Sequence, residues 1–518
     1  MYLVTASEMR KMDHLTIDSF GIPGIVLMEN AGRGATQILF DKFHDLTQKK
    51  VAVVAGRGNN GGDGFVIARY LAQKGIDVTV YLLAQSENIK GDAAANLKLL
   101  APLAIPVIEM PNQNAFSANK TALVHQNVWV DAILGTGLKS EVKDYFRSVI
   151  DFMNQSDKPI FAVDIPSGLD SDTGQPCGTC ICAQATATFA FAKTGHMLFP
   201  GAMLTGTLEI VDIGIPPHIV EEVRPWQYLL TTDRVRTYFE PRPPDAHKGN
   251  SGHLLVLAGS PGKTGAAAMT ALSAMRVGVG LVTLGIPQSL NPVLEAQVLE
   301  VMTCPLPESV NGMLDESSLD VIRELLPGKK CLAIGPGIGT TADTKNLVHR
   351  MIQECTIPMV MDADGLNCLA GNTRLLKDIK APAVLTPHPG EMARLTDTTP
   401  DQIQKDRISC TRDLAKKFNV HVVLKGARTV IAHPDGRVFV NPTGNPGMAS
   451  GGMGDVLTGM IAGLITQGFS VESATHAGVF LHGAAADALE KTKGPFGFLA
   501  SDLMTAIPEQ IKELMFDV

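Results

Sequence analysis

The sequence predicts an α/β protein of two domains, each built around a parallel sheet. At 518 residues the chain is long enough for two large domains. Short apolar segments that fit buried strands run into glycine-rich turns and then into segments that favour helix, as at residues 50–55, 56–64 and 65–74. Residues 78–83 fit the next strand, which completes a β-α-β unit. Such a unit implies parallel strands with a right-handed crossover.

The composition predicts a folded protein without a nucleic-acid surface. Hydrophobic residues make up 45% and charged residues 19% of the chain, which allows a large core and argues against global disorder. The net charge of -8 leaves no basic footprint for nucleic acid, although local phosphate sites remain compatible with it. Three of the eight cysteines, Cys177, Cys180 and Cys182, are closely spaced. No second cluster with metal-ligand spacing accompanies them, so we expect reduced loop thiols rather than a zinc site.

The N-terminal segment predicts no export signal and no membrane span. Residues 1–40 favour helix with a break at residues 21–24, and residues 1–20 mix charged with apolar residues as an amphipathic helix does. No run of about 18 apolar residues without charge occurs in the sequence. We therefore expect a protein of the cytoplasm that does not bind membranes.

Polar side chains follow three predicted strands of the first domain. The turn at residues 56–64 carries Asn59, Asn60 and Asp63 among its glycines. A turn rich in Asn and Gly is common, but nine such residues after a clear strand favour a binding loop over a plain turn. Because the loop follows the carboxyl end of its strand, it lies where open α/β sheets bind ligands.

The next two strands repeat this arrangement. Residues 129–137 deliver Asp131 and then a Gly-Thr-Gly turn, and residues 161–168 deliver Asp164 and Ser167. The carboxyl ends of parallel strands meet at one edge of a sheet, so these side chains should lie close together. The oxygen atoms of Asn60, Asp131 and Ser167 would suit a hard cation.

A proline-rich stretch marks the domain boundary. Prolines gather at residues 215–217 and 240–245, which is typical of a connector. We therefore divide the chain into a first domain of residues 1–220, a linker of residues 221–235 and a second domain of residues 236–518.

The second domain begins again with a strand and a glycine-rich turn. Its turn at residues 259–265 lacks the Gly-x-x-x-x-Gly-Lys-Ser/Thr spacing, so we reject a Walker A loop. Residues 429–440 predict a hairpin, and residues 470–489 predict a helix that carries His476 and His482. Buried histidines of this kind are more often core residues than ligands, and we assign them no site. Further predicted strand ends lie at residues 332–339, 359–365, 384–391 and 421–428.

Residues 445–464 predict a phosphate-binding turn. Glycine and proline crowd the first half, whereas the second half favours helix, so a flexible loop enters a helix N-terminus. Unpaired N–H groups and the helix dipole favour an anion there. Asp455 stands at this point, and two interpretations are open. It is either a general base for phosphoryl transfer or a helix-capping residue.

The motifs together resemble a known family. The first domain resembles the YjeF N-terminal domain through Asn-Asn-Gly-Gly-Asp-Gly (59–64) and Val-Asp-Ile-Pro-Ser-Gly (163–168). The second resembles its partner carbohydrate-kinase-related domain. Its motifs are Gly-Pro-Gly (335–337), Asp-Ala-Asp (362–364), Thr-Pro-His-Pro-Gly-Glu (386–391), Lys-Gly-Ala (425–427) and Gly-Gly-Met-Gly-Asp (451–455). Nearly the whole chain therefore resembles the bacterial bifunctional NAD(P)H-hydrate repair enzymes.

The resemblance implies a Rossmann-like domain joined to a ribokinase-like domain, with one activity in each. The first domain would epimerise the R and S forms of hydrated NADH and NADPH. The second would dehydrate the S form at the expense of ADP or ATP, with AMP and phosphate released from ADP. The implied cofactors are K⁺ for the epimerase and Mg²⁺ for the dehydratase. A homo-oligomer is also expected.

The resemblance also implies roles for individual residues of the first domain. Asp164 would contact the hydrated ring and act as the acid–base group, and K⁺ would bind Asn60, Asp131 and Ser167. The dinucleotide would be bound by Asn59, Asn60, Gly61, Gly62, Asp63, Gly135, Thr136, Gly137 and Asp164.

In the second domain Asp455 would take the hydroxyl proton. The hydrate would lie against Ala267, Gly337, His388 and Asp455. The nucleotide would lie against Lys425, Gly426, Ala427, Arg428, Thr429 and Gly454. Two rival functions stay open from the sequence: a small-molecule kinase fused to an accessory domain, and a first domain that senses a nucleotide without turning it over.

Overall fold

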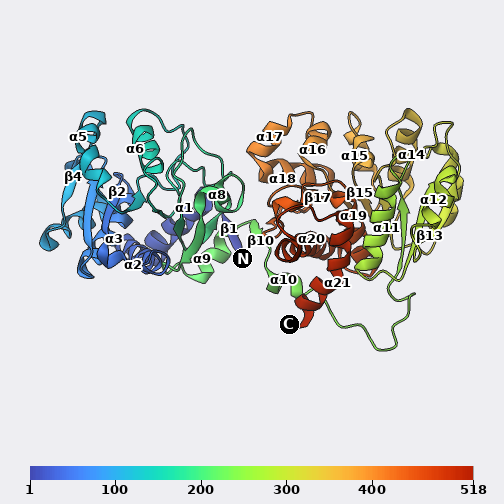
Figure 1. Ribbon diagram of the computed structural model, residues 1–518, viewed down its shortest axis with the longest axis horizontal. Coiled ribbons are helices and arrows are strands. Elements are labelled where there is room, and N and C mark those ends of the chain that lie inside the picture. The colour runs from blue at the N-terminus through green and yellow to red at the C-terminus, as the bar shows by residue number, and fades with distance from the viewer. Residues whose placement is uncertain (517–518) are drawn as a thin grey trace. The chain divides into compact units, whose positions relative to one another are not determined.

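The computed structural model describes residues 1–516 and divides into two compact units. One unit comprises Tyr2–Gln227, and the other comprises Met1 with Tyr228–Val518. The division falls inside the stretch of residues 221–235 that we expected to be a linker. In Figure 1 the N-terminal unit is coloured blue to green, and the C-terminal unit runs from green to red.

The N-terminal unit is built on a seven-stranded parallel sheet in the order β4-β3-β2-β5-β6-β7-β9. Counted from β2, the first six strands follow the 3-2-1-4-5-6 order of a Rossmann sheet. The predicted α/β class is confirmed, and the topological switch point lies between β2 and β5. Near the N-terminus the expected helical segment begins instead with a short strand, β1, which pairs with β8.

The elements of the N-terminal unit follow in chain order. The strands are β1 (Tyr2–Val4), β2 (Lys50–Ala55), β3 (Asp77–Leu82), β4 (Val107–Glu109), β5 (Val128–Ala132), β6 (Ile160–Val163), β7 (Ala185–Phe189), β8 (Ala192–Lys193) and β9 (Thr207–Val211). The helices are α1 (Ala6–His14), α2 (Gly24–Lys42), α3 (Asn59–Gln73), α4 (Gly91–Lys98), α5 (Gln113–Val124), α6 (Asp144–Asn154), α7 (Thr194–Met197), α8 (Gly201–Thr205) and α9 (Pro217–Val223).

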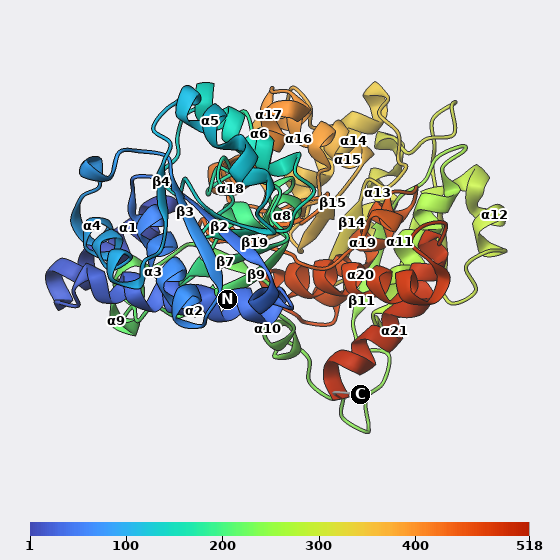
Figure 2. The same ribbon diagram turned by 60° about the vertical axis from the view of Figure 1, so that its left-hand side comes forward.

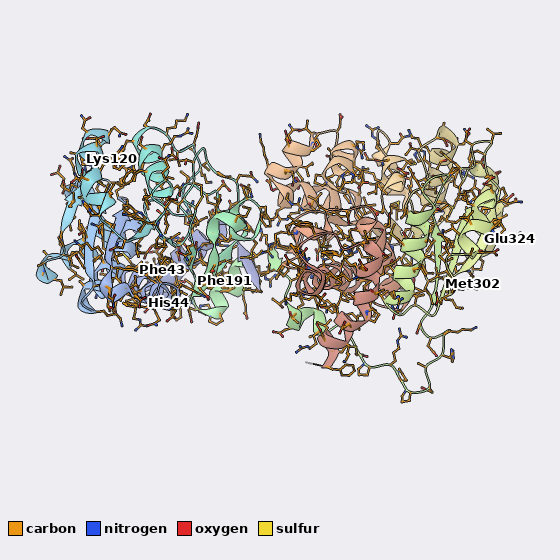
Figure 3. All side chains as sticks on the ribbon, in the orientation of Figure 1. Phe43, His44, Lys120, Phe191, Met302 and Glu324 are labelled. Atoms are coloured by element: carbon orange, nitrogen blue, oxygen red, sulfur yellow. The ribbon has the colours of Figure 1, made fainter. Side chains whose placement is uncertain are left out.

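Both faces of this sheet are covered, which explains its uninterrupted apolar strands. Successive side chains of a strand point to opposite faces, so Val51 and Val53 pack with residues of α2 and α3, whereas Val54 packs with residues of α5 and α6. Phe43 lies in the first of these cores (Figure 3). Its ring packs edge-on against the ring of Phe161, with the ring centroids 6.0 Å apart.

The predicted binding loop after β2 is shorter than expected. Helix α3 begins at Asn59, so the glycines that we placed in a loop lie in the first turns of the helix. They are needed there because neighbouring atoms are close. A Cβ atom on Gly61 would lie 2.1 Å from the Gly56 carbonyl oxygen, and one on Gly64 would lie 2.6 Å from the Ala132 Cβ. Close packing therefore accounts for glycines that we had assigned to a binding loop.

The C-terminal unit is also α/β. Its strands follow the order β13-β12-β11-β14-β15-β16-β17-β18-β19. The first seven are parallel, and β18 and β19 form the predicted antiparallel hairpin next to β17. The carboxyl ends of the central strands again lie at one edge of a sheet.

The elements of this unit follow in chain order, after β10 (Gln227–Leu229) at the boundary. The strands are β11 (His253–Leu257), β12 (Leu281–Pro287), β13 (Met302–Leu306), β14 (Cys331–Ile334), β15 (Met359–Met361), β16 (Ala383–Leu385), β17 (His421–Leu424), β18 (Val430–Ala432) and β19 (Val438–Val440). The helices are α10 (Thr232–Arg236), α11 (Thr264–Arg276), α12 (Asn291–Glu295), α13 (Leu319–Leu325), α14 (Ala342–Glu354), α15 (Asp364–Asn367), α16 (Pro389–Thr396), α17 (Pro400–Lys405), α18 (Arg407–Phe418), α19 (Met453–Thr466), α20 (Val471–Lys493) and α21 (Ala500–Phe516).

Helices α11, α19, α20 and α21 lie together against one face of this sheet (Figure 2). Helices α11 and α19 approach closely because Gly459 presents no side chain to its neighbour. A Cβ atom there would lie 2.0 Å from the Thr270 carbonyl oxygen. This packing fixes the start of α19, where Asp455 lies. Among residues 1–516 no helix is long and apolar enough to cross a membrane.

Candidate active sites

The N-terminal unit contains a cavity of about 1040 Å³ at the carboxyl ends of β2, β5 and β6. This volume suits a ligand of considerable size. Most of the predicted dinucleotide-binding residues line it, namely Asn59, Asn60, Asp63, Gly135, Thr136, Gly137 and Asp164. Gly61 and Gly62 lie in the helix behind this surface. The cavity is also lined by Asp13 and Lys193, which the sequence did not single out.

Of the three predicted cation ligands Asn60 lines this cavity, and Asp131 and Ser167 are fully buried next to its lining residue Leu134. The Ser167 hydroxyl donates to Asp131 Oδ1 at 2.6 Å, and the Ser167 N–H donates to Asp131 Oδ2 at 2.7 Å. Asn60 Nδ2 donates to the Leu134 carbonyl oxygen at 3.2 Å, which also accepts from the Ser167 hydroxyl at 3.2 Å. Asn60 Oδ1 is buried and finds no hydrogen-bond partner among residues 1–516. An oxygen in that situation favours a cation nearby, because burial without a partner is costly.

Asp164 is held in its charged form by a buried lysine. The Lys193 ammonium donates to Asp164 Oδ1 and, at 2.8 Å, to the Thr188 hydroxyl. Burial favours the neutral acid, but the Lys193 charge outweighs that effect and lowers the pKa of Asp164. Asp164 also has φ of 64°, in the left-handed region that is unusual for a residue with a side chain. The strand end therefore holds this carboxylate in a special position.

Two other carboxyl groups at the cavity have pKa values above the ordinary aspartate value. Burial raises the pKa of Asp13 to about 6, and burial together with the Asp164 charge raises the pKa of Asp63 well above its usual value. Asp164, whose pKa is lowered, and Asp63, whose pKa is raised well above its usual value, therefore share a single cavity. Pairs of groups whose pKa values are pushed apart are the arrangement that acid–base catalysis uses.

Sequence reasoning missed Lys193 and Asp13 for identifiable reasons. Lys193 ends a mostly apolar segment that begins at Ala185. A single lysine in such a segment could have indicated a buried ion pair, because lysine is rarely buried without a partner. Asp13 lies in α1, where the amphipathic pattern made each charged residue look solvent-exposed. Only the folded chain shows that the helix turns Asp13 toward the cavity.

The C-terminal unit has a second lysine–aspartate pair, in which the aspartate is buried. Lys425 follows β17, and its ammonium lies 2.5 Å from Asp362 Oδ1 and 3.8 Å from Glu391 Oε2. The Thr458 hydroxyl donates to Asp362 Oδ2 at 2.7 Å, so both carboxylate oxygens are engaged. Asp362 and Glu391 belong to motifs that carried the family resemblance, but neither was assigned a site role.

Asp455 lies beside this pair. Helix α19 begins at Met453, and its N-cap residue is Gly452 with φ of 91°. Asp455 is in the first turn, and the helix has no side-chain cap, so the capping interpretation of Asp455 is wrong. Its carboxylate makes no hydrogen bond or ion pair with residues 1–516. Burial, followed by the charge of Asp362, raises the pKa of Asp455 to about 7, which is the range a general base needs near neutral pH.

Small residues keep the space around Asp455 open. A Cβ atom on Gly454 would lie 3.3 Å from Lys425 Nζ. Among the other predicted nucleotide contacts, Gly426 has φ of 131° and Arg428 has φ of 56°, so the backbone turns sharply after β17. The Thr429 hydroxyl donates to the Gly426 carbonyl at 3.1 Å, and the Arg428 guanidinium donates to the Pro442 carbonyl. Ala427 is exposed between them.

The predicted hydrate contacts occupy neighbouring strand ends. His388 caps α16, is half exposed and lies 3.4 Å from Glu391, which links it to Lys425. Gly337 has φ of 64°, and a Cβ atom on it would lie 2.9 Å from the Lys263 Cβ, at the start of α11. Ala267 is fully buried in α11, so its side chain supports that turn rather than offering an exposed surface. Lys263 binds Asp364 at 2.8 Å across the same edge.

Taken together, these features are those of a two-domain α/β enzyme, in which each unit has a carboxyl group of raised pKa beside a lysine–aspartate ion pair. Comparisons with known proteins agree with that class. Residues 24–195 match the family described as YjeF-related protein N-terminus, and residues 254–509 match the family described as NAD(P)H-hydrate dehydratase.

Several curated relatives match along almost the whole chain. A bifunctional NAD(P)H-hydrate repair enzyme of Moorella thermoacetica is 43% identical over 519 residues, which cover 100% of this chain and 98% of the relative. The enzyme of that description from Escherichia coli K12 is 36% identical, with 97% and 92% covered. The chain therefore belongs to the family of bifunctional NAD(P)H-hydrate repair enzymes, and the predicted resemblance is confirmed.

Solved structures match the C-terminal part. The ADP/ATP-dependent NAD(P)H-hydrate dehydratase of Bacillus subtilis, co-crystallised with ATP/Mg²⁺, is 32% identical. The match covers 55% of this chain and 98% of that chain, with a TM-score of 0.49.

The geometry predicts that Lys193→Met destabilises the N-terminal unit. Removing one partner of a buried ion pair leaves an uncompensated charge, which costs about 3–5 kcal/mol. Denaturant unfolding followed by circular dichroism measures the loss. Lys493→Met is a matched control, because Lys493 pairs with Asp502 at the surface and an exposed pair contributes less than about 1 kcal/mol. Equal stability of the two variants would contradict the role given to Lys193.

Proposed function

We propose that the N-terminal unit epimerises the hydrated ring of NADHX and NADPHX. Inversion at a hydroxyl-bearing carbon is helped by an acid that protonates the departing hydroxyl and a base that deprotonates the returning water. Asp164, kept ionised by Lys193, is suited to the base, and Asp63, kept neutral by burial, is suited to the acid. The observation that carries this assignment is that one cavity holds two carboxyl groups whose pKa values are shifted in opposite directions, Asp63 upward and Asp164 downward. Asn59 and Gly135–Gly137 lie where they would bind the dinucleotide.

The C-terminal unit is proposed to dehydrate the S form with ADP or ATP. Hydroxide is a poor leaving group, whereas a phosphorylated hydroxyl leaves as phosphate. Asp455 would take the hydroxyl proton, the N–H groups of residues 452–454 would stabilise the charge on the transferring phosphoryl group, and the nucleotide would lie against residues 425–429. ADP would then leave as AMP.

A Mg²⁺ ion suits this site chiefly through the nucleotide's phosphates. Asp362 and Asp364 already bind Lys425 and Lys263, so the chain itself offers few uncommitted carboxylate oxygens. Mg²⁺ commonly keeps several waters and binds phosphate oxygens with one or two carboxylates. When bound it would neutralise charge on the phosphates. Asp455 is the carboxylate best placed to share it.

For the N-terminal unit we propose K⁺ as the cation. The uncommitted Asn60 Oδ1, the Leu134 carbonyl and the Asp131–Ser167 pair offer mainly neutral oxygens with one charge, which suit a weakly hydrated monovalent ion. The ion would offset the cost of burying Asp131, whose pKa burial raises to about 6. Its role would be to order the strand ends that carry the dinucleotide-binding residues.

The potassium site is tested by crystals of the full chain soaked in a heavier potassium analogue. We expect an anomalous peak within bonding distance of Asn60 Oδ1 and the Leu134 carbonyl oxygen. Asn60→Ala should remove the peak, whereas Asn127→Ala, at the opposite end of β2, should not. An empty site together with full epimerase activity in potassium-free buffer would refute the proposal.

Asp455→Asn is expected to abolish dehydration and leave epimerisation intact. The substitution preserves size but removes the proton acceptor, and general-base catalysis typically contributes about 10²–10⁴ in rate. The measurement is nucleotide-dependent recovery of NADH from the S hydrate, followed by absorbance. Epimerisation by the same sample is the control for folding.

The direction of the stability change adds a second control. An aspartate whose pKa is raised in the folded state binds its proton more tightly there, so folding weakens as the pH rises from the ordinary aspartate pKa of about 3.9 to the raised value, and the full cost remains above it. Asp455→Asn should therefore not melt lower than wild type at pH above about 7. Wild-type turnover by the variant would contradict the assignment, and accumulation of a phosphorylated ligand by the wild type would favour the kinase alternative.

A cytoplasmic location, a homo-oligomeric state and the lack of nucleic-acid or membrane partners stay predictions from the sequence. The assignment of one activity to each domain is likewise part of this proposal. It draws support from the separate cavity of the N-terminal unit and the separate carboxyl cluster of the C-terminal unit.

A further inference from the structure

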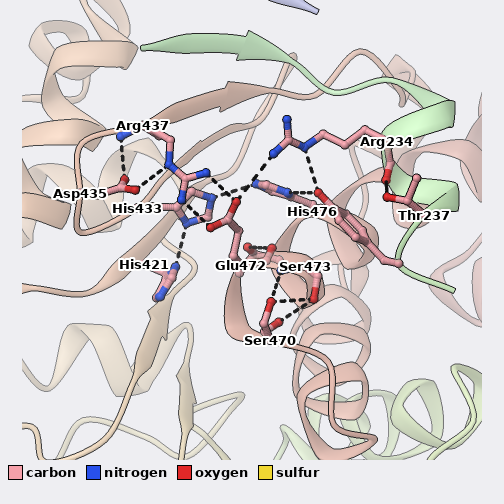
Figure 4. A network of polar contacts seen from close by, with 12 residues as sticks. Arg234, Thr237, His421, His433, Asp435, Arg437, Ser470, Glu472, Ser473 and His476 are labelled. Carbon is pink, nitrogen blue, oxygen red and sulfur yellow. Dashed lines mark hydrogen bonds and ion pairs between the residues drawn. The ribbon is translucent and has the colours of Figure 1, made fainter. Parts of the chain in front are cut away.

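A cluster of histidines lies in the core of the C-terminal unit and takes no part in the proposed activities (Figure 4). His433 directly follows β18, and Glu472 and His476 lie one turn apart on α20. Spacing of four residues places both side chains on one face of the helix. Each of the three offers a ligand atom, and these atoms all lie within 4.8 Å of one another. The sequence had suggested only a core role for His476.

The two histidines face each other through the same nitrogen. His433 Nε2 and His476 Nε2 lie 2.8 Å apart, and both rings are almost fully buried. Burial lowers the pKa of His433 to about 3 and holds that of His476 well below its usual value, which favours the neutral form of each ring. A neutral imidazole presents a lone pair, which is the form that binds a metal ion.

The outer nitrogen of each ring already has a partner. His433 Nδ1 lies 2.8 Å from Nδ1 of His421, and His476 Nδ1 lies 2.9 Å from the Tyr238 hydroxyl. Arg234 Nε donates to that hydroxyl at 3.0 Å, so the Tyr238 oxygen accepts a hydrogen bond. If the two outer nitrogens carry the protons, both Nε2 lone pairs point into the space between the rings. Metal-binding histidines typically have such partners at their other nitrogen.

Glu472 supplies the charge at this cluster. Arg437 binds its carboxylate through two contacts of 2.9 Å and 2.6 Å, and Arg234 lies 3.8 Å away. Asp435 binds Arg437 in turn, so the four charged side chains balance. The Glu472 side chain is 29% exposed, which gives one oxygen room to turn toward the histidines while the other stays with Arg437.

We propose that His433 Nε2, His476 Nε2 and the Glu472 carboxylate form a site for a divalent transition-metal ion, with Zn²⁺ as the representative. Two imidazoles and one carboxylate are a known zinc donor set, and imidazole selects against Mg²⁺ and K⁺. With Zn–N distances of about 2.0–2.1 Å the two nitrogens would move to roughly 3.3 Å apart. The ion would join the β18–β19 hairpin to α20.

The alternative is a histidine network held only by hydrogen bonds. In that case one Nε2–H group donates a hydrogen bond to the other Nε2, and the Tyr238 hydroxyl donates a hydrogen bond to His476 Nδ1. The two states differ by the position of one proton on His476 and the direction of one hydroxyl. Adding metal distinguishes the two states, because only the first leaves both Nε2 lone pairs free to bind an ion.

The test is zinc titration of the chelator-treated full chain by calorimetry, in excess Mg²⁺ and K⁺ to fill oxygen-based sites. The His433→Asn/His476→Gln double variant should bind one zinc ion per chain fewer than wild type. His253→Gln is the matched control, because His253 contacts Thr283 in another part of the unit and should keep the full stoichiometry. Co²⁺ should give the intense visible absorption of a tetrahedral site in the wild type and lose it in the double variant.

Two milder variants keep the test sharp if the double variant folds poorly. Glu472→Gln preserves the size of the side chain and should weaken zinc binding, with loss of the melting-temperature rise that zinc gives the wild type. Tyr238→Phe removes the hydroxyl that contacts His476 Nδ1 and Arg234 Nε but no proposed zinc ligand, and it should lower zinc affinity by about 10–100-fold at unchanged stoichiometry. Wild-type zinc stoichiometry and affinity in all these variants, or no zinc bound by the wild type, would overturn the proposal.

Discussion

An ion pair between a lysine and an aspartate, with one partner fully buried, recurs at the strand ends of both units. In the N-terminal unit Lys193 binds Asp164, and in the C-terminal unit Lys425 binds Asp362. Lys193 keeps Asp164 ionised in a place where burial alone would favour the neutral acid, and Lys425 places its positive charge against Asp362 in the same way. The negative charge retained in this way then acts on the next carboxyl, Asp63 in one site and Asp455 in the other, and helps to raise its pKa. The protonation states that acid–base chemistry requires thus follow from one kind of ion pair.

The fold supplies these pairs with fixed positions. Parallel strands bring their carboxyl ends to one edge, and the following helices begin there with glycines in place of side chains. Gly61 and Gly64 let α3 press against the sheet, and Gly459 lets α19 press against α11. As a result Asn60 and Asp455, both in first helical turns, are held by close packing. The packing and the chemistry of each site therefore depend on the same short segments.

Much of this was predictable from the sequence, because it depends on local patterns. Apolar strands followed by glycine turns predicted the α/β class, and the hairpin at residues 429–440 followed from alternation and turn residues. The strand-end position of Asp131, Asp164 and Ser167 was also predicted, and the structure brings Asn60 and Ser167 to the same carbonyl group.

The remainder depends on contacts between distant segments, which local pattern does not encode. Lys193 and Asp13 meet Asp164 and Asp63 only after α1 and β8 are placed, so their role was missed. Helix α3 starts earlier than expected because close contacts, not turn geometry, require its glycines. The pairing of His433 with His476 joins residues 43 positions apart and left no motif.

The central claim is that burial and the neighbouring Asp362 charge hold the pKa of Asp455 near neutrality. Carbon-13 NMR of labelled aspartate carboxyls in the full chain measures it directly, with Asp455→Asn used to assign the resonance. The account predicts a titration midpoint of about 7. A midpoint near the ordinary aspartate value of about 3.9 would contradict it.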